Sequence, residues 1–515
     1  MLVLLLALGT TFPYFEKIRS ANELPRLMQG IALVEDGSWS IDGPKRRGLD
    51  PGPDTSRGAD GRSYPNKPPL TSVLAAVGYI GAKTTADASP TLRACMLWSR
   101  LLAGLLPTLV LCAWAWRRYA PREGREAAWL GVLLYAVATP AASYAHLLYA
   151  HQLAACLATI GAAWCLDGAE LGRWRRAAVG GALAAAAVVA EYQAVVLALP
   201  LGLVLLGKLR RPAARMPVCA SLVAAIAMMV ALAAYHDTAF GSPLATGYHH
   251  AETREFAAKH AVGVLGLGLP TWDGVYTHVF SPQHGLLWWV PLCPLAVYGL
   301  GQRAVTPGPH RDEARVALGF FLTLLILGCS LSFDGGWRVG PRYLMVAMPA
   351  LILGWGHAFR QFGASAWRVG LAMFFAVWSA LQNSLAASSW PHIDATNIYY
   401  PLADVLVPLF RADYQPYSVA WWLGSDLGVP VAVGTSTLAV LVAVLRVGEV
   451  GIRTIWLSTV AVLTALYGVA LTPSITPEHP KRSRNLRYIR SVYEPTPGPR
   501  ALAASRPVPP ARPGP

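Results

Sequence analysis

The sequence predicts an all-α protein that crosses a membrane many times. Of its 515 residues, 54% are hydrophobic and 14% are charged, whereas soluble domains carry about 25% charged residues. The apolar residues form runs of about 15 to 22 residues, long enough for a helix to cross the hydrocarbon core of a bilayer. The basic residues concentrate in short loops between these runs, as the positive-inside rule requires of cytoplasmic loops.

Thirteen apolar runs are predicted to be membrane spans. They lie near 1–14, 96–116, 127–145, 151–167, 176–190, 193–207, 216–235, 285–301, 315–332, 344–359, 367–386, 430–446 and 454–472. A further run, 70–86, would place the basic pair Arg117 and Arg118 outside if it also crossed. We therefore expect 70–86 to be a helix lying along the outer interface. The N-terminus is then inside and the C-terminus outside.

The predicted transmembrane domain covers 1–472 and has three long loops. These loops, 15–95, 236–284 and 387–429, all fall on the outer side of the predicted topology. The working surface is therefore expected to be extracytoplasmic, on a plasma (inner) membrane. Residues 473–515 form a basic, proline-rich tail that is predicted to be disordered.

Composition and motifs exclude several classes of function. The net charge is +15, but the cations lie beside apolar runs, so nucleic acid is not expected as a partner. The seven cysteines show no metal-ligand spacing. No nucleotide-binding or zinc-protease motif is present. No cofactor is predicted, and a divalent metal stays an alternative without support from the sequence.

The first outer loop contains the candidate catalytic residue, Glu23. Apolar residues recur at helical spacing over 23–34, which predicts an interfacial helix with Glu23 in its first turn. A carboxylate there can act as general base on an acceptor hydroxyl. The alternative is that Glu23 complements the helix dipole. Arg26, one turn later, is a candidate substrate-binding cation.

Lys67 is the second candidate in this loop. It precedes Pro68 and Pro69, which fix the backbone until the apolar run begins. A cation held at that point lies where a lipid phosphate would present its charge. Tyr64 is placed in the same substrate-binding group. The alternative is an ordinary solvated loop.

Further polar residues lie at the outer ends of later spans. His146 and His151 lie in one short loop, and either could be a structural residue of the core. Glu191 interrupts an apolar stretch, and an ionisable residue at membrane depth is a candidate functional residue. Arg338 and Arg342, in the glycine-containing loop 333–343, suit a phosphate because guanidinium groups bind its oxygens in a planar fork.

Tyr343, directly after Arg342, could stack on a sugar ring. It could equally anchor the protein at the membrane interface, which is the ordinary place for aromatic residues in a membrane protein. Glu23 is thus the predicted catalytic residue. The predicted substrate-binding residues are Arg26, Tyr64, Lys67, His146, His151, Glu191, Arg338, Arg342 and Tyr343.

The order of these elements resembles the polyprenyl-phosphate-dependent membrane glycosyltransferases of the GT-C fold, the superfamily of protein O-mannosyltransferases and aminoarabinose transferases. The matching motifs over about 1–390 are Asn22-Glu23, Lys67-Pro68-Pro69-Leu70, Arg100-Leu101 and Glu191-Tyr192. The resemblance implies an outer-face catalytic carboxylate, a lipid-linked sugar donor and transfer with inversion. It makes Glu23 the base candidate and Lys67 a phosphate ligand.

This chain departs from the family pattern at one position: it has Asn22 where the family commonly has aspartate. Either Glu23, Asp36 or another acidic residue of the loop serves as the catalytic base in place of that aspartate, or the chain is an inactive GT-C-like subunit. The leading hypothesis is an inverting glycosyltransferase that uses an undecaprenyl- or decaprenyl-phosphate sugar. Its acceptor would be a hydroxyl on a glycan, lipid or protein. A lipid or glycan transporter, or flippase, is the alternative from a different class, but no internal repeat supports it.

Overall fold

The computed structural model describes residues 1–495 apart from 14, 16–19, 87–88, 262, 264–265, 332–335, 363–364, 390, 394–396 and 449–450. It is built almost entirely from helices, which confirms the all-α prediction. Asp334 and its neighbours in the predicted Arg338 loop lie outside the described residues.

The N-terminal quarter holds the first outer loop and its short elements. Before the loop, α1 (Leu2–Leu4) and the π-helix η1 (Leu5–Gly9) lie in the predicted span 1–14; the loop itself contains α2 (Leu24–Glu35), α3 (Asp42–Arg46), β1 (Thr55–Arg57), β2 (Ser63–Pro65) and α4 (Leu70–Thr84). The predicted interfacial helix is α2, within one residue at each end. The run predicted not to cross is α4.

The long helices follow. They are α5 (Leu92–Arg100), the π-helix η2 (Leu101–Leu105), α6 (Leu106–Glu123), α7 (Arg125–Val137), α8 (Ala141–Tyr144), α9 (His151–Leu171), α10 (Trp174–Ala190), the 3₁₀ helix η3 (Tyr192–Leu197), α11 (Ala198–Lys208) and α12 (Pro212–Phe240).

The second outer loop contributes η4 (Gly247–His250), α13 (Arg254–His260), α14 (Trp272–Val275), η5 (Tyr276–Phe280) and α15 (Leu286–Trp289). The remaining elements are α16 (Cys293–Val305), α17 (Arg311–Cys329), η6 (Arg342–Leu344), α18 (Ala350–Phe362), α19 (Ala366–Ser389), η7 (Leu402–Leu406), α20 (Val407–Arg411), α21 (Val419–Trp422), α22 (Gly428–Val447), α23 (Ile452–Ile475) and α24 (Arg482–Tyr493).

Six helical stretches in the described part of the chain are long and apolar enough to cross a membrane. They are Leu92–Glu123, His151–Leu171, Pro212–Phe240, Ala366–Ser389, Gly428–Val447 and Ile452–Ile475. Each coincides with a predicted span, so the chain is an integral membrane protein. The total of thirteen stays a prediction, because the other predicted spans correspond to helices that do not meet both criteria.

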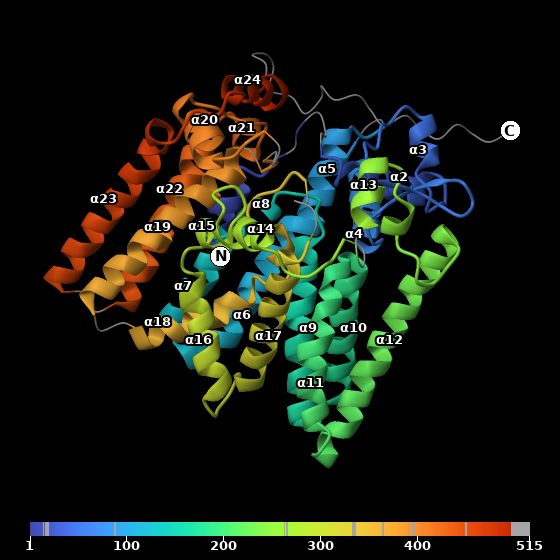
Figure 1. Ribbon diagram of the computed structural model, residues 1–515, viewed down its shortest axis with the longest axis horizontal. Coiled ribbons are helices and arrows are strands. Elements are labelled where there is room, and N and C mark those ends of the chain that lie inside the picture. The colour runs from blue at the N-terminus through green and yellow to red at the C-terminus, as the bar shows by residue number, and fades with distance from the viewer. Residues whose placement is uncertain are drawn as a thin grey trace.

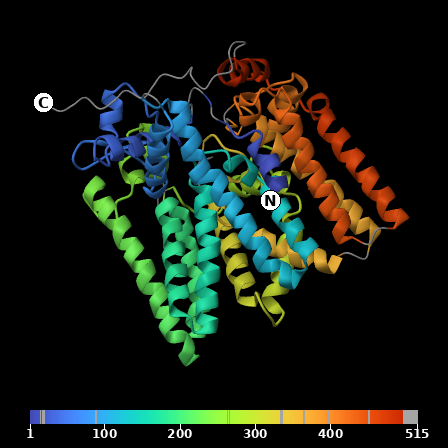
Figure 2. The ribbon, with the colours of Figure 1, turned by 180° about the vertical axis from the view of Figure 1, so that it is seen from behind.

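The short elements gather at one end of the long helices. Figure 1 shows α2, α3, α13 and α24 at the top, and the tips of α11, α12, α16 and α17 at the opposite end. The view from behind shows the same separation (Figure 2). Elements of the three long loops, which lie far apart in the sequence, therefore form one layer at this end of the long helices. We call it the polar layer.

Helices α9 and α10 approach closely because glycines line their contact. A Cβ atom on Gly180 would lie 2.5 Å from the backbone nitrogen of Cys165, and one on Gly161 would lie 2.5 Å from that of Ala184. Small residues at such positions let helix backbones meet within a membrane, where apolar burial does not drive association. This contact sets the spacing between His151 at the start of α9 and Glu191 just after α10.

Glu252 ties the second outer loop to the first. Its carboxylate accepts hydrogen bonds from Thr55 Oγ1 at 2.5 Å and from Ser63 Oγ at 3.1 Å. The antiparallel strands β1 and β2, in which Thr55 faces Pro65, present both hydroxyls on one side. A backbone bridge between Ser56 and Ala251 completes the contact.

Part of the tail is ordered, contrary to the expectation that 473–515 is disordered. Residues Arg482–Tyr493 form α24, in which Ile489 and Tyr493 are buried. The Tyr493 ring packs edge-on against Phe15, with centroids 4.7 Å apart. The basic composition of the tail gave no indication of this amphipathic helical face. Residues 496–515 lie outside the described part.

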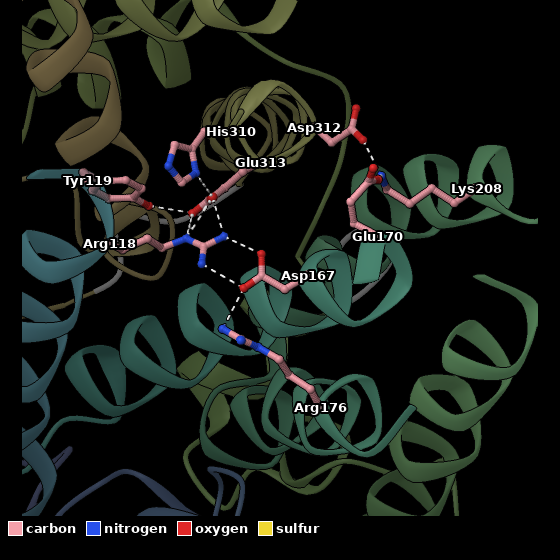
Figure 3. Close-up of polar contacts among 9 residues, drawn as sticks. All are labelled: Arg118, Tyr119, Asp167, Glu170, Arg176, Lys208, His310, Asp312 and Glu313. Carbon is pink, nitrogen blue, oxygen red and sulfur yellow. Dashed lines mark hydrogen bonds and ion pairs between the residues drawn. The ribbon is translucent and has the colours of Figure 1, made fainter. Parts of the chain in front are cut away.

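An ionic network joins the helices at the end away from the polar layer (Figure 3). Arg118 on α6 lies 2.9 Å from Asp167 on α9 and 2.9 Å from Glu313 on α17. Arg176 pairs with the same Asp167 at 2.7 Å, and His310 lies 2.8 Å from Glu313. Beside it, Lys208 bridges Glu170 and Asp312, at 2.7 Å from each. The network links four helices.

Candidate functional site

A cavity of about 1,090 Å³ lies where the polar layer meets the long helices. Its polar wall comes from all regions that the sequence analysis singled out: the first outer loop, the ends of α9 and α10, the second outer loop and η6. The residues of this wall include Ser20, Asn22, Asp54, Asn66, Lys67, Tyr149, His151, Glu191, Tyr248, Arg342 and Tyr343.

The rest of the cavity wall is apolar. It comes from η3, α12 and α17, through Val195, Val196, Ile226, Met229, Val230, Leu324 and Leu327. Ile226 and Val230 are 51% and 61% exposed, although they lie on α12, which is long and apolar enough to cross a membrane. This wall therefore extends to the surface that would face lipid.

Lys67 enters the cavity as a cation without an ion-pair partner among the described residues. Its Nζ lies 3.3 Å from the Tyr248 hydroxyl and 4.7 Å from the centre of that ring. Burial lowers the pKa of Lys67, and the charges of Arg342 and Arg26 lower it further, while Asp54 opposes them. Such a group gains stabilisation when an anion binds beside it.

Arg342 is the second cation of the cavity wall. Its Nε donates to His151 Nε2 at 3.0 Å, and its guanidinium lies 5.0 Å from the centre of the Tyr149 ring. Burial would lower the pKa of Arg342, but nearby tyrosines and Glu191 hold it above its ordinary value. The side chain is thus a permanent cation that lies over an aromatic ring.

Three carboxylates line the cavity, Asp54, Glu191 and Glu255, and Glu255 is paired with Lys259 at 2.8 Å. Asp54 directly precedes β1, and its Oδ2 lies 3.5 Å from the Asn22 amide nitrogen. Glu191 follows the last residue of α10, where the backbone is extended. Glu191 Oε2 lies 3.5 Å from His151 Nδ1 and 3.9 Å from Arg26 Nη2.

The structure gives Glu23 a different setting from the one predicted. The carboxylate is fully buried and does not line the cavity. Arg100 Nε and Nη2 each donate to one of its oxygens at 2.9 Å, and the Leu148 N–H donates at 2.7 Å. Both carboxylate oxygens are thus engaged by donors within the protein, and the base role of Glu23 stays a prediction. The partner Arg100 comes from the Arg100-Leu101 motif, 77 residues away in the sequence.

Lys67, His151, Glu191, Arg342 and Tyr343 line the cavity as the sequence analysis grouped them. This placement brings them together but does not test their binding roles. The four other predicted substrate-binding residues do not line the cavity; they are Arg26, Tyr64, His146 and Arg338. Each has a neighbour that accounts for its position.

These four residues have structural contacts. Arg26 bonds the backbone and side-chain oxygens of Asn22. Tyr64 donates to Asp60 at 2.9 Å. His146 is fully buried between the carbonyl oxygens of Leu8 and Ala387, at 2.7 and 3.0 Å. Arg338 is buried, and its backbone N–H donates to the Ile393 carbonyl at 3.0 Å.

Sequence reasoning underrated Asp54 and Tyr248. Asp54 is one of several aspartates in a loop rich in glycine and proline, and no local pattern separates it from Asp50 or Asp60. Tyr248 lies in η4, 181 residues after its partner Lys67. Only the contact between the two outer loops identifies them. Among the described residues, no group of three or more histidine, cysteine, aspartate or glutamate side chains could hold a metal ion.

Comparisons with known proteins give matches to solved structures alone. No family model matches the chain, and no curated protein matches it by sequence. The chain is similar to ArnT from Cupriavidus metallidurans bound to undecaprenyl phosphate, with 18% identity and a TM-score of 0.48, covering 92% of this chain and 76% of that one. It is also similar to the arabinosyltransferase EmbB from Mycobacterium smegmatis, with 14% identity and a TM-score of 0.48. That match covers 92% of this chain but 40% of EmbB.

Proposed function

We propose that this protein is a membrane glycosyltransferase that takes a sugar from a polyprenyl-phosphate donor and transfers it to an acceptor hydroxyl on the extracytoplasmic face of the plasma membrane. The observation that carries the proposal is the shape and chemistry of one cavity. Its polar end holds cations in a mostly buried setting, and its apolar wall reaches the surface that would face lipid. That combination suits an amphiphile with a phosphate head and a hydrocarbon chain.

The apolar wall is where the polyprenyl chain would lie. Ile226, Val230 and Val195 are each about half exposed or more, and all three line the cavity. A chain passing over them would bury apolar surface at about 25 cal/mol per Å² relative to water. It could also continue into the bilayer beside α12, so a long lipid need not fit inside the cavity.

The phosphate would lie between Lys67 and Arg342. As the bond between the anomeric carbon and the phosphate oxygen breaks, negative charge develops on that oxygen. Fixed cations in a setting of low dielectric stabilise such charge more strongly than water does. The ammonium of Lys67 contacts the neutral Tyr248 hydroxyl and forms no ion pair among the described residues, so its charge is available for this role.

Asp54 takes the base role that the sequence analysis gave to Glu23. Its carboxylate lines the cavity, whereas Glu23 is closed off by Arg100. In the proposed reaction, Asp54 accepts the proton of the acceptor hydroxyl, and the acceptor oxygen attacks the anomeric carbon. The bond to phosphate breaks as the new bond forms on the opposite face, so the configuration inverts and polyprenyl phosphate leaves.

The test is release of polyprenyl phosphate from a panel of decaprenyl- and undecaprenyl-phosphate pentoses and hexoses. Purified protein in nanodiscs would be supplied with cell-envelope extract as the source of acceptors. Release from at least one donor, lost in Asp54→Asn and Lys67→Ala, is expected. If no donor is consumed while a labelled lipid crosses the bilayer in the same nanodisc-derived liposomes, the protein is a transporter and the proposal is wrong.

A further inference from the structure

We infer that His151 and Glu191 position Arg342 for the donor phosphate and do not bind the substrate themselves. This inference rests on the proposed function, because it assigns the phosphate to Arg342. It replaces the substrate-binding role that the sequence predicts for both residues. Its basis is a set of contacts running from the cavity wall through His151 to the end of α10.

The contact between Arg342 and His151 fixes the state of the imidazole. A guanidinium N–H can only donate, so His151 Nε2, at 3.0 Å from Arg342 Nε, must accept. A ring nitrogen that accepts carries no proton, so His151 is neutral with its proton on Nδ1. The proton on Nδ1 then points towards Glu191, whose Oε2 lies 3.5 Å away.

Two buried groups converge on Glu191 Oε2, which is itself buried. His151 Nδ1 and Arg26 Nη2 approach this oxygen at 3.5 and 3.9 Å, and none of the three atoms has a hydrogen-bond partner in the described part of the chain. Buried polar atoms without partners are costly. A shift of a few tenths of an ångström would bring His151 Nδ1–H within hydrogen-bond distance of the carboxylate. Hydrogen bonds in ligand-free sites are often long in this way and shorten when the ligand binds.

His146 shows what a purely structural histidine looks like in the same loop. Both of its ring nitrogens face backbone carbonyl oxygens, and it does not line the cavity. His151 instead lies between a cation that lines the cavity and a carboxylate that follows α10. This is the arrangement in which one residue orients a ligand-binding group and a further carboxylate fixes its tautomer.

The test measures binding of farnesyl phosphate to the full chain in nanodiscs, with farnesol as the probe that lacks phosphate. His151→Leu is expected to weaken farnesyl phosphate binding by about tenfold or more, because it removes the acceptor for a charged donor. His151→Gln keeps a carbonyl oxygen within reach of Arg342 and should lose less than about threefold. Glu191→Leu should resemble His151→Leu, and Glu191→Gln should retain most of the affinity.

A double-mutant cycle separates positioning from folding. His151→Leu in the Arg342→Ala background is expected to cause no further loss, because the group that it orients is gone. Farnesol affinity should be the same in all these variants, and His146→Gln should leave farnesyl phosphate affinity unchanged. Equal losses for farnesol and farnesyl phosphate, or additive losses in the cycle, would overturn the inference.

The two proposals fail in different ways. If the wild-type chain binds farnesyl phosphate and Arg342→Ala weakens it while His151→Leu binds like the wild type, positioning by His151 is wrong and the proposed function stands. If the wild-type chain binds farnesyl phosphate no better than farnesol, the phosphate site itself is wrong, and both proposals fall.

Discussion

The charged groups at the two ends of α9, α10 and α17 differ in how they are partnered. At one end, Arg118 meets two carboxylates at 2.9 Å, and Lys208 meets two more at 2.7 Å (Figure 3). At the other end, Lys67 has no ion pair among the described residues. There, the closest charged contact of Arg26 is Glu191 at 3.9 Å. A closed ionic network thus lies at one end of these helices, and incompletely paired cations lie at the other.

This difference separates charges that hold helices together from charges kept for a ligand. Taking a cation out of water is costly, and an opposite charge nearby offsets the cost. For Arg118 and Lys208, carboxylates of the protein itself offset this cost. Lys67 has no ion pair among the described residues, and an incompletely paired group with a perturbed pKa in a cavity is a candidate for function. The comparison yields five predictions, taken from the largest expected effect to the smallest.

Asp54→Asn should reduce the turnover number by about a thousandfold, within the range that general-base catalysis supplies. The carboxamide keeps the size of the side chain but cannot take the proton. Farnesyl phosphate affinity should change little, because Lys67 and Arg342 are intact. Asp50→Asn in the same loop is the matched control and should keep normal turnover. Normal turnover in Asp54→Asn would remove the base assignment.

Glu23→Gln should destabilise the protein by about 3–5 kcal/mol, because it leaves the buried guanidinium of Arg100 without its carboxylate. The measurement is denaturant unfolding in detergent micelles. Turnover per folded molecule should stay within severalfold of the wild type, since Glu23 does not line the cavity. A stable variant without turnover would return the catalytic role to Glu23.

Lys67→Met should weaken farnesyl phosphate binding about a hundredfold, the scale on which preorganised charges act on a phosphate. The same change should raise the thermal unfolding temperature, because a mostly buried cation without an ion pair is replaced by an apolar side chain of similar length. Loss of stability in this variant would show that Lys67 serves the fold.

Arg118→Leu should have the opposite effects to Lys67→Met: lower stability and unchanged ligand binding. It should lower the free energy of unfolding by roughly 1–2 kcal/mol, between the values for exposed and fully buried pairs, because Arg118 is partly buried and leaves Asp167 and Glu313 with fewer partners. Farnesyl phosphate affinity should not change. An affinity loss without destabilisation would mean that the two ends of the helices are coupled.

Acid should weaken the Glu23–Arg100 pair in a defined direction. Burial raises the pKa of Glu23, but Arg100, His392 and the Leu148 N–H together hold it below its ordinary value of 4.5. A depressed pKa stabilises the fold above pH 4.5, and this contribution disappears as the pH falls through the folded-state pKa. Stability of Glu23→Gln should be less sensitive to pH over that window, which denaturant unfolding at several pH values would show.

Local patterns in the sequence predicted the elements of the fold well. The apolar spacing after Glu23 predicted α2 to within a residue, and the apolar run 70–86 forms the helix α4, whose predicted position at the interface stays a prediction. Six of the predicted spans match apolar helices of sufficient length. These features depend on residues that are close together in the chain, so the periodicity and composition of the sequence are enough to predict them. Lys67, which the sequence singled out from the prolines beside it, lines the cavity, and its binding role stays a prediction.

The choice between carboxylates could not be made from the sequence. Glu23 and Asp54 both lie in the first outer loop, and what separates them is Arg100, which closes off Glu23 from 77 residues away. The sequence likewise gave no sign of the contacts of Tyr64 with Asp60 and of His146 with Ala387, which lie outside the cavity lining. A helical face with two buried residues was likewise hidden in the basic tail at α24.

The bond between Glu252 and the strands β1 and β2 has a consequence for how this protein can vary. Asp54 directly precedes β1, so its location depends on a residue almost 200 positions later, in a different loop. An insertion near Glu252 would move the acid even though the first loop is untouched. Grafting either loop alone into another scaffold should therefore misplace Asp54, while exchanging both together should carry the geometry intact.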